Sequence, residues 1–162
     1  MSNLLVQNIK HTNGTTAMTV DSSGRVKREL IPHFFVKHNQ SINSNQTPVI
    51  FNIVTHNTGS HYDNTTGIFT CPVAGLYYFS SFGIFGQQAS AATWGDYKIQ
   101  QNGNDFAKGH FNNPSDVRWE QVHISAIIPC SANDAIRCVF SISSGTPDFY
   151  QDYNAFQGYL IG

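Results

Sequence analysis

Charge is scarce in this chain of 162 residues. Charged residues make up 12% of it, about half the ~25% of an ordinary soluble domain. Nine basic and ten acidic residues leave a net charge of −1, whereas nucleic-acid-binding proteins usually carry a basic excess that neutralises phosphates. The chain also lacks the run of ~20 apolar residues that a membrane-spanning helix requires. We therefore expect neither nucleic-acid binding nor membrane insertion.

Cysteine is scarce as well. The three cysteines are Cys71, Cys130 and Cys138, and none forms the CxxC pair of a zinc or redox motif. Cys130 and Cys138 flank a turn, so a disulfide across a hairpin is one hypothesis and buried reduced thiols are the other. The N-terminus has neither the basic segment nor the apolar core of a secretory signal, so we expect synthesis in a cytoplasm.

Motifs of the common enzyme classes are missing too. The sequence contains no GxSxG, HExxH, P-loop or GxGxxG pattern. The seven histidines are scattered, and the nearest grouping, His56 and His61 with Asp63, is more typical of an exposed loop than of a metal site. We expect no enzymatic activity, no metal site and no cofactor.

Aromatic residues and short strand patterns are what the chain does have. Aromatics make up 13%, including 12 Phe and 7 Tyr. From His33 onward, apolar and polar residues alternate in short runs between clusters of Gly, Pro, Asn and Asp, which favours strands and turns over helices. We predict an all-β sandwich of the jelly-roll type over residues 32–162, with strands at 33–38, 47–56, 67–71, 75–85, 94–101, 105–111, 118–128, 135–143 and 154–161.

Residues 1–31 have a different character. They are polar and contain two short alternating stretches and two turn signals, Asn13-Gly14 and Ser23-Gly24. Their apolar surface is too small for a core of their own. We interpret this segment as an extended N-terminal arm that anchors the domain to another protein. Its candidate anchoring residues are Leu4, Val6, Ile9, Met18 and Val20.

Four stretches of the larger domain form a specific pattern, at residues 34–39, 48–52, 62–79 and 155–160. The third contains Tyr-Asp, Gly-x-Phe and Pro-x-x-Gly-x-Tyr-x-Phe in succession, and the fourth contains Phe-x-Gly-x-Leu. This pattern resembles the globular head of complement first-component subunit q, a jelly-roll relative of the tumour necrosis factor family. We interpret five residues of these stretches as core: Phe69, Tyr77, Phe79, Phe156 and Leu160.

The resemblance covers about residues 33–162 and implies a ten-stranded jelly-roll sandwich that assembles as a homotrimer. It also implies a binding or structural module and not an enzyme. Some relatives bind calcium near the trimer axis, but Asp134 is the one matching carboxylate in that loop, so no calcium site is carried over.

The arm carries a second resemblance. Residues 6–9 and 13–26 are similar to N-terminal segments of tailed-phage virion proteins. This similarity implies a virion surface protein that is made in the host cytoplasm and has tail or capsid proteins as partners.

Three polar loops with aromatic residues are candidates for ligand binding. An aromatic ring can stack on the apolar face of a sugar while Asp, Asn and Gln bind its hydroxyls. The alternative for Trp94, Trp119, Tyr150 and Tyr153 is a core or trimer-interface position. The aspartates that flank the tyrosines are more typical of a solvated loop than of a catalytic acid/base pair. The candidate ligand-binding residues are Trp94, Asn112, Asp116, Asp148, Tyr150, Asp152 and Tyr153.

These observations favour a trimeric phage adhesin, of the tail-fibre or spike type, that binds a host surface receptor or glycan. A capsid decoration protein that stabilises the head is the first alternative. A cellular lectin-like binding protein is the second.

Overall fold

Strands joined by turns and irregular segments make up the ranges that the computed structural model describes, which are residues 6–28, 31–87, 93–113, 119–145 and 147–162. The chain divides into two units, Met1–Ile31 and Pro32–Gly162, and we describe each by itself. No helix in the described ranges is long and apolar enough to span a membrane.

The N-terminal unit (residues 1–31) is an antiparallel three-stranded meander of β1 (Asn8–Lys10), β2 (Thr16–Val20) and β3 (Val26–Lys27). Gly14 and Gly24 turn between these strands with φ of 88° and 76°, a conformation that glycine adopts without steric cost. The expectation of an extended arm is therefore wrong for the described part of this segment. Sequence analysis did not predict β3, because a strand of two residues is too short to show alternation of apolar and polar residues.

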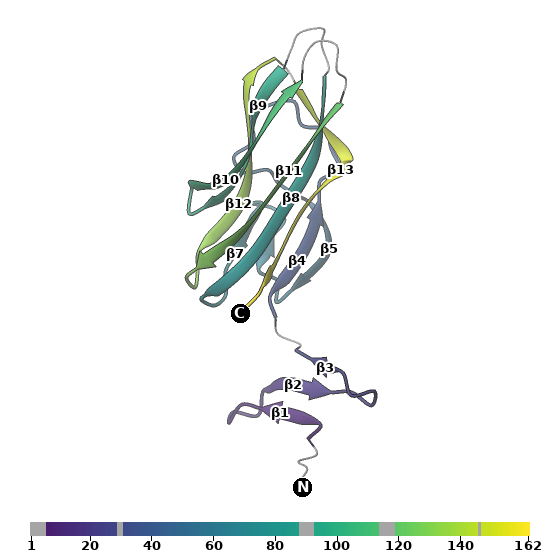
Figure 1. Ribbon diagram of the computed structural model, residues 1–162, viewed down its shortest axis with the longest axis vertical. Coiled ribbons are helices and arrows are strands. Elements are labelled where there is room, and N and C mark those ends of the chain that lie inside the picture. The colour runs from purple at the N-terminus through teal and green to yellow at the C-terminus, as the bar shows by residue number, and fades with distance from the viewer. Residues whose placement is uncertain (1–5, 29–30, 88–92, 114–118, 146) are drawn as a thin grey trace. The chain divides into compact units, whose positions relative to one another are not determined.

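The head (residues 32–162) is a sandwich of two five-stranded antiparallel sheets (Figure 1). The first sheet has the order β11-β8-β13-β4-β5, and the second has the order β10-β9-β12-β7-β6. The strands are β4 (His33–Lys37), β5 (Ile53–Thr58), β6 (Tyr62–Asp63), β7 (Ile68–Thr70), β8 (Gly75–Gln87), β9 (Thr93–Gln101), β10 (Asn104–Asn113), β11 (Trp119–Cys130), β12 (Ala135–Ser144) and β13 (Pro147–Leu160).

One predicted strand, 47–56, is displaced in the structure. Its first half is irregular chain, because Pro48 has no N–H to donate to a ladder. Val49 and Phe51 nevertheless fill the core, and the segment is held by isolated bonds such as Val49 N–H to the Cys138 carbonyl (2.9 Å). The regular strand β5 begins at Ile53.

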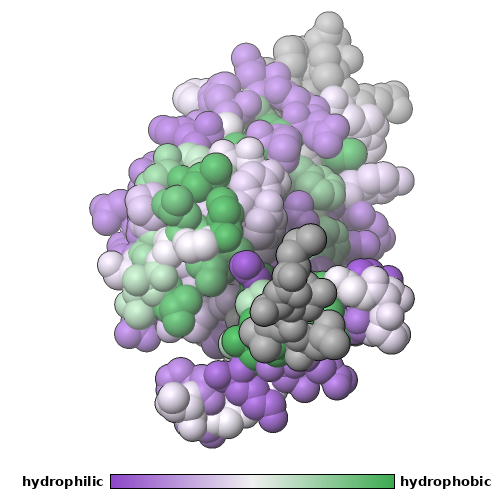
Figure 2. Space-filling model, turned by 60° about the horizontal axis from the view of Figure 1, so that its bottom comes forward, coloured by the Kyte–Doolittle hydropathy of each residue, from purple (hydrophilic) through white to green (hydrophobic). Residues whose placement is uncertain are grey.

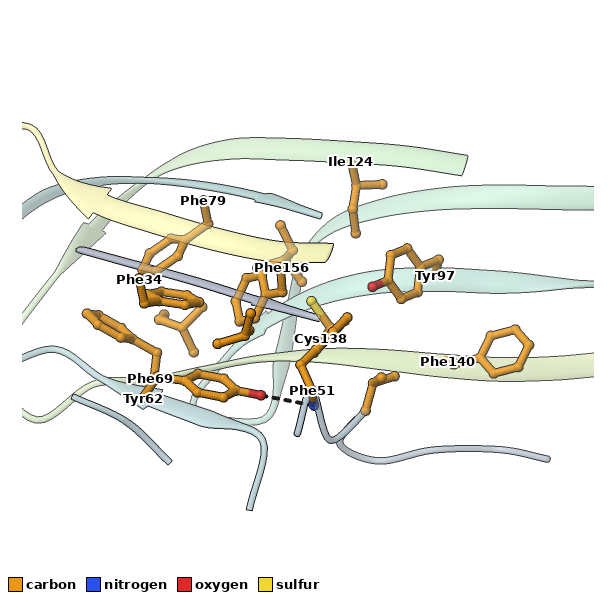
Figure 3. Close-up of a cluster of buried hydrophobic side chains, with 14 of the residues drawn as sticks. Phe34, Phe51, Tyr62, Phe69, Phe79, Tyr97, Ile124, Cys138, Phe140 and Phe156 are labelled. Carbon is orange, nitrogen blue, oxygen red and sulfur yellow. Dashed lines mark hydrogen bonds between the residues drawn. The ribbon is translucent and has the colours of Figure 1, made fainter. Parts of the chain in front are cut away.

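The core between the sheets is aromatic (Figure 3). Phe34 stacks on Phe69 with ring centroids 4.8 Å apart and meets Phe156 edge-on at 4.9 Å. The hydroxyl of Tyr62 accepts a bond from the Phe51 N–H (3.1 Å). Of the predicted core residues, Phe69, Tyr77, Phe79 and Phe156 are fully buried, and Leu160 packs against them while partly buried.

Gly67 shows why a turn in this core needs glycine. Its φ is +72°, and a Cβ at this position would lie 2.6 Å from the carbonyl oxygen of Val49. A larger residue would have to displace backbone that closes the core.

All three cysteines are buried free thiols, so the disulfide hypothesis for Cys130 and Cys138 is wrong. The turn between them joins β11 of the first sheet to β12 of the second, and it is not a hairpin within one sheet. Cys130 pairs across the ladder with Gly75, and Cys138 with Ile99. Burial raises the pKa of the Cys138 thiol to about 12.

Candidate binding site

A large bulge interrupts β13 where it runs beside β8. Phe149 is opposite Phe85 and Asn154 is opposite Gly83, so residues 150–153 together stand across from Ile84 alone. Asp152 takes a φ of +65° within this bulge, which a non-glycine residue rarely adopts. Bulges re-aim side chains out of the regular ladder, and here the side chains concerned are Tyr150 and Tyr153.

Buried hydrogen bonds fix the shape of this bulge. The amide Nδ2 of Asn154 donates to the carbonyls of Tyr150 (2.8 Å) and His38 (3.2 Å). Its Oδ1 accepts the N–H of His38 (2.7 Å). Because Asn154 is 1% exposed, these bonds form away from water, where an unmade bond would be costly. The two tyrosines are therefore presented on a pinned backbone.

The bulge forms one wall of a surface cavity of about 320 Å³, which we call the aromatic cleft. Ile84, Trp119, Tyr150 and Tyr153 line it. The ring centroids of Trp119 and Tyr150 are 4.5 Å apart with the planes nearly perpendicular, and Tyr153 lies 6.2 Å from Tyr150. Trp119 is 51% exposed and Tyr153 is 57% exposed, so both rings offer free apolar surface to a ligand.

Gly86 makes room for the tryptophan. This residue pairs with Trp119 across the β8–β11 ladder, and a Cβ on it would lie 2.4 Å from Cζ3 of the indole. The ring of Trp119 therefore occupies the space in which a side chain of residue 86 would lie. The cleft therefore requires glycine at this position of β8.

The structure brings together only some of the predicted ligand-binding residues. Tyr150 and Tyr153 line the cleft, and Asp152 is exposed on the bulge. Asp148 is buried in β13, directly before the residue Phe149 at which the bulge begins. Trp94 and Asn112 do not contribute, because they pair with each other in the second sheet. Asp116 lies outside the described residues.

Sequence reasoning missed Trp119 and Ile84 as members of this site. Sequence analysis weighs Trp119, like Trp94, between ligand binding and a core or trimer-interface position. It does not include Trp119 among the candidate residues, although this residue directly follows a polar loop at the start of a strand. Ile84 carried no signal, because its role depends on the bulge opposite it in β13.

The outer face of the second sheet is charged and internally paired. Asp96 contacts the His110 Nδ1 (3.1 Å) and the Lys108 ammonium (3.6 Å), while Lys98 contacts Asp105 (3.1 Å). Ion pairs of this exposed kind stabilise a fold by at most about 1 kcal/mol each. Trp94 stands beside this ladder, with its ring 5.9 Å from that of His110.

Asp134, the carboxylate considered for calcium, is engaged by the protein itself. It accepts bonds from Asn102 Nδ2, Gln101 Nε2 and the Ser131 N–H, each at 2.8 Å. These bonds, that from Asn102 foremost, lower the pKa of its carboxyl group. In the described part of the chain, no group of three or more potential metal ligands occurs.

An apolar patch occupies the other end of the first sheet. Ile127, Tyr78 and Tyr159 form a row across β11, β8 and β13, with Leu76 and Ile161 beside them. Ile127 is 57% exposed and Tyr159 is 48% exposed. Figure 2 shows apolar surface gathered on the end of the head that comes forward there. Leu76 lies about 26 Å along β8 from Ile84, at the ~3.3 Å rise of a strand.

The N-terminal unit has an apolar face of its own. Register places Ile9 opposite Met18 and Val20 opposite Val26, and no described side chain of this unit is buried. Val6 is 37% exposed, and Leu4 lies outside the described residues. The described anchoring candidates remain predictions, to which this face adds Val26.

Comparisons with known proteins show which family has this architecture. The family model described as the C1q domain matches residues 33–161. Collagen alpha-1(X) chain of Mus musculus is 27% identical over 121 residues, which cover 70% of this chain and 16% of that protein. Protein HP-25 homolog 2 of Bos taurus is 39% identical over 46 residues, covering 28% of this chain and 21% of the relative. The matched segments thus span about a fifth or less of these relatives.

A solved structure agrees with the family match. The globular domain of zebrafish complement 1qA protein has a TM-score of 0.66 at 21% identity, with coverage of 82% of this chain and 98% of that one. At this identity the likeness shows a shared all-β fold of the jelly-roll type.

Proposed function

Because the chain belongs to the C1q domain family, we propose that it is a trimeric recognition head that binds a cell-surface saccharide through the aromatic cleft. In this proposal the N-terminal unit attaches the head to a tailed-phage virion, and the protein is an adhesin of the fibre or spike type. The observation that carries the binding role is the pinned bulge, which presents Tyr150 and Tyr153 beside the exposed ring of Trp119.

The chemistry of the cleft suits a saccharide. Exposed aromatic rings provide flat apolar surface for the C–H face of a sugar ring, and a few polar groups at the margin orient it. A cavity of about 320 Å³ lies at the small end of the usual range for ligand sites, which suits one or two sugar units. C1q domains are typically non-enzymatic, and binding without catalysis is part of the proposal.

Trimer formation is supported by the contrast between the two faces of the head. C1q domains commonly form trimers, and the apolar patch on the first sheet is the kind of surface that assembly buries. The outer face of the second sheet is charged instead, with Asp96, Lys98, Asp105 and Lys108 in exposed or half-exposed pairs. We therefore propose that copies associate through the end of the first sheet that carries this patch, with the second sheet and the aromatic cleft facing solvent.

Attachment to a virion is supported by residues 6–9 and 13–26, which are similar to N-terminal segments of tailed-phage virion proteins. The apolar face of Ile9, Met18, Val20 and Val26 has no described core beneath it, so docking on another protein would bury it. The relatives found by comparison are animal proteins, and the virion role depends on this segment alone.

Localisation and competition together test this function. Cryo-electron microscopy of purified particles is expected to show threefold density at the tail or fibre end, and purified protein is expected to block adsorption of the phage to its host. The Trp119→Ala variant should lose this competition, whereas Trp94→Ala, which lies on the other sheet, should keep it.

Other outcomes separate the alternatives. Density spread over the capsid lattice, with adsorption unaffected, would favour a decoration protein that stabilises the head. If no particle contains the chain, the virion role fails and a cellular lectin-like module is what remains.

A further inference from the structure

Asp148 has a buried oxygen without a partner. The residue is 7% exposed, and its Oδ1 has no hydrogen-bond partner. Burying a carboxylate oxygen in this way is costly, and an unsatisfied polar group in a native fold calls for an explanation such as a bound ligand, ion or water. No described Lys, Arg or His forms an ion pair with Asp148, and the described ion pairs of the head lie on the second sheet.

Strand register places Asp148 beside the aromatic cleft. Asp148 is opposite Gly86 in β8, and Gly86 is opposite Trp119 in β11. The next pair, Phe149 and Phe85, points into the core, so Asp148 is on the outer face with the cleft. The indole of Trp119 lies over Gly86 between them, and Tyr150 follows two residues after Asp148.

Two aspartates accompany the cleft. Asp148 lies next to it on β13, and Asp152 lies on the bulge between the two tyrosines. The faces of Trp and Tyr rings carry negative potential and attract organic cations. Rings and carboxylates at this site therefore favour the same kind of ligand, since a neutral sugar offers Asp148 hydroxyl donors but leaves its negative charge uncompensated.

We propose that the aromatic cleft binds an organic ammonium group, and that in the saccharide of the proposed function this group is the amine of an amino sugar. The ammonium packs against Trp119 and Tyr153, and the negative charge of Asp148 next to the cleft compensates its positive charge. This inference rests on the proposed function for the source of the ammonium, but the preference for positive charge is a property of the cleft alone.

A matched pair of ligands tests the charge preference without any variant of the site. In a Trp94→Phe background, Trp119 is the one remaining tryptophan, so its fluorescence reports on the cleft. The tetramer of glucosamine is expected to bind at least tenfold more tightly than the tetramer of N-acetylglucosamine, which differs by neutral acetyl caps. Raising the salt concentration should narrow this difference.

Two substitutions then locate the charge. Asp148→Asn keeps the shape of the side chain and should remove most of the preference for the amine, whereas Asp152→Asn on the exposed bulge should change it less than threefold. Arg118 precedes Trp119 in the sequence but lies outside the described residues. Arg118→Gln should leave binding of the amine unchanged or tighter, and weaker binding would overturn the proposal.

The outcomes distinguish this inference from the function on which it rests. Equal affinity for the two tetramers would overturn the ammonium preference and leave a saccharide-binding head intact. Binding of methylammonium and choline without either tetramer would uphold the cation site and refute the amino sugar. No binding of any of these probes would overturn the inference, while adsorption competition would still test the adhesin.

Discussion

The side chain of Asn154 bonds the backbone of His38 in both directions, accepting its N–H at 2.7 Å and donating to its carbonyl at 3.2 Å. The amide of Asn154 thus makes with His38, directly after the end of β4, the two bonds that the backbone of a neighbouring strand would otherwise make. The same amide donates to Tyr150, so one buried residue ties the end of β4 to the bulge that forms the aromatic cleft.

Asn154→Ala should therefore damage both folding and binding. The substitution leaves buried backbone groups of His38 and Tyr150 without partners, which costs about 1–3 kcal/mol of stability. Urea unfolding should register this loss, and ligand affinity should fall at least tenfold. Asn112→Ala is the matched control, because Asn112 is exposed and surface changes usually stay within about 0.5 kcal/mol. Unchanged affinity in Asn154→Ala would show that the pinned bulge is not needed for binding.

Gly86→Ala and Gly83→Ala should have opposite consequences. A Cβ on Gly86 meets the half-exposed indole of Trp119, which can move aside, so the fold survives and the cleft is lost. A Cβ on Gly83 would lie 1.9 Å from Cε2 of the buried Phe149, and such overpacking costs about 1–3 kcal/mol. Thermal unfolding and ligand titration of both variants separate the two effects. Equal affinities of Gly86→Ala and the wild type would contradict the proposed position of the ligand.

Ile127→Asp should convert the trimer to monomers. Ile127 is 57% exposed in the apolar patch, and a charge there would have to be buried at the proposed interface. Phe106→Asp is the control, since Phe106 is 45% exposed in β10 of the second sheet. Sedimentation velocity is expected to give a monomer for the first variant and a trimer for the second. The reverse result would place the interface on the second sheet.

Stability should fall at alkaline pH, in part through Cys138. Burial raises the pKa of this thiol from 9.0 to about 12, so between these values the unfolded chain loses a proton that the folded chain keeps. The stabilisation is complete below pH 9 and declines as the pH rises toward 12, by up to about 1.4 kcal/mol per pH unit for one group. Urea unfolding at pH 8, 9, 10 and 11 should show a shallower decline in Cys138→Ala. Burial also raises the pKa of Tyr97, so the stability of Cys138→Ala should still decline somewhat with pH. If the stability of the variant and of the wild type declined in parallel, the assignment to Cys138 would be refuted.

Deletion of residues 2–28 should leave the head folded and trimeric while abolishing its incorporation into particles. The meander forms a sheet separate from both sheets of the head, so its removal breaks no ladder there. Calorimetry and sedimentation test the head, and mass spectrometry of purified particles tests incorporation. The double substitution Ile9→Asp and Val20→Asp should reproduce the loss of incorporation. Unfolding of the truncated head would contradict the boundary between the two units.

Period-two alternation and turn residues determined the class of this fold, because strand periodicity is a local property of the chain. The same holds for the aromatic core: Phe69, Tyr77 and Phe79 alternate along β7 and β8 in the sequence as they do in the structure. Local signals also placed turns at Gly14 and Gly24, but they could not show that three short strands pair, since pairing joins residues up to 11 positions apart.

Only the tertiary structure decided the site. Tyr150 and Tyr153 were predicted because aspartates flank them in the sequence. Trp119, Ile84 and Gly86 lie beside them only because of the register between β8, β11 and β13, which local sequence does not encode. The same register separated Trp94 from them by placing it on the other sheet. It also put Cys130 and Cys138 in different sheets, because the turn between them crosses the sandwich. The sequence by itself thus determined the all-β class, the turns and the aromatic core, while long-range pairing determined where strands such as β3, β5 and the first half of β13 form and which residues meet at the surface.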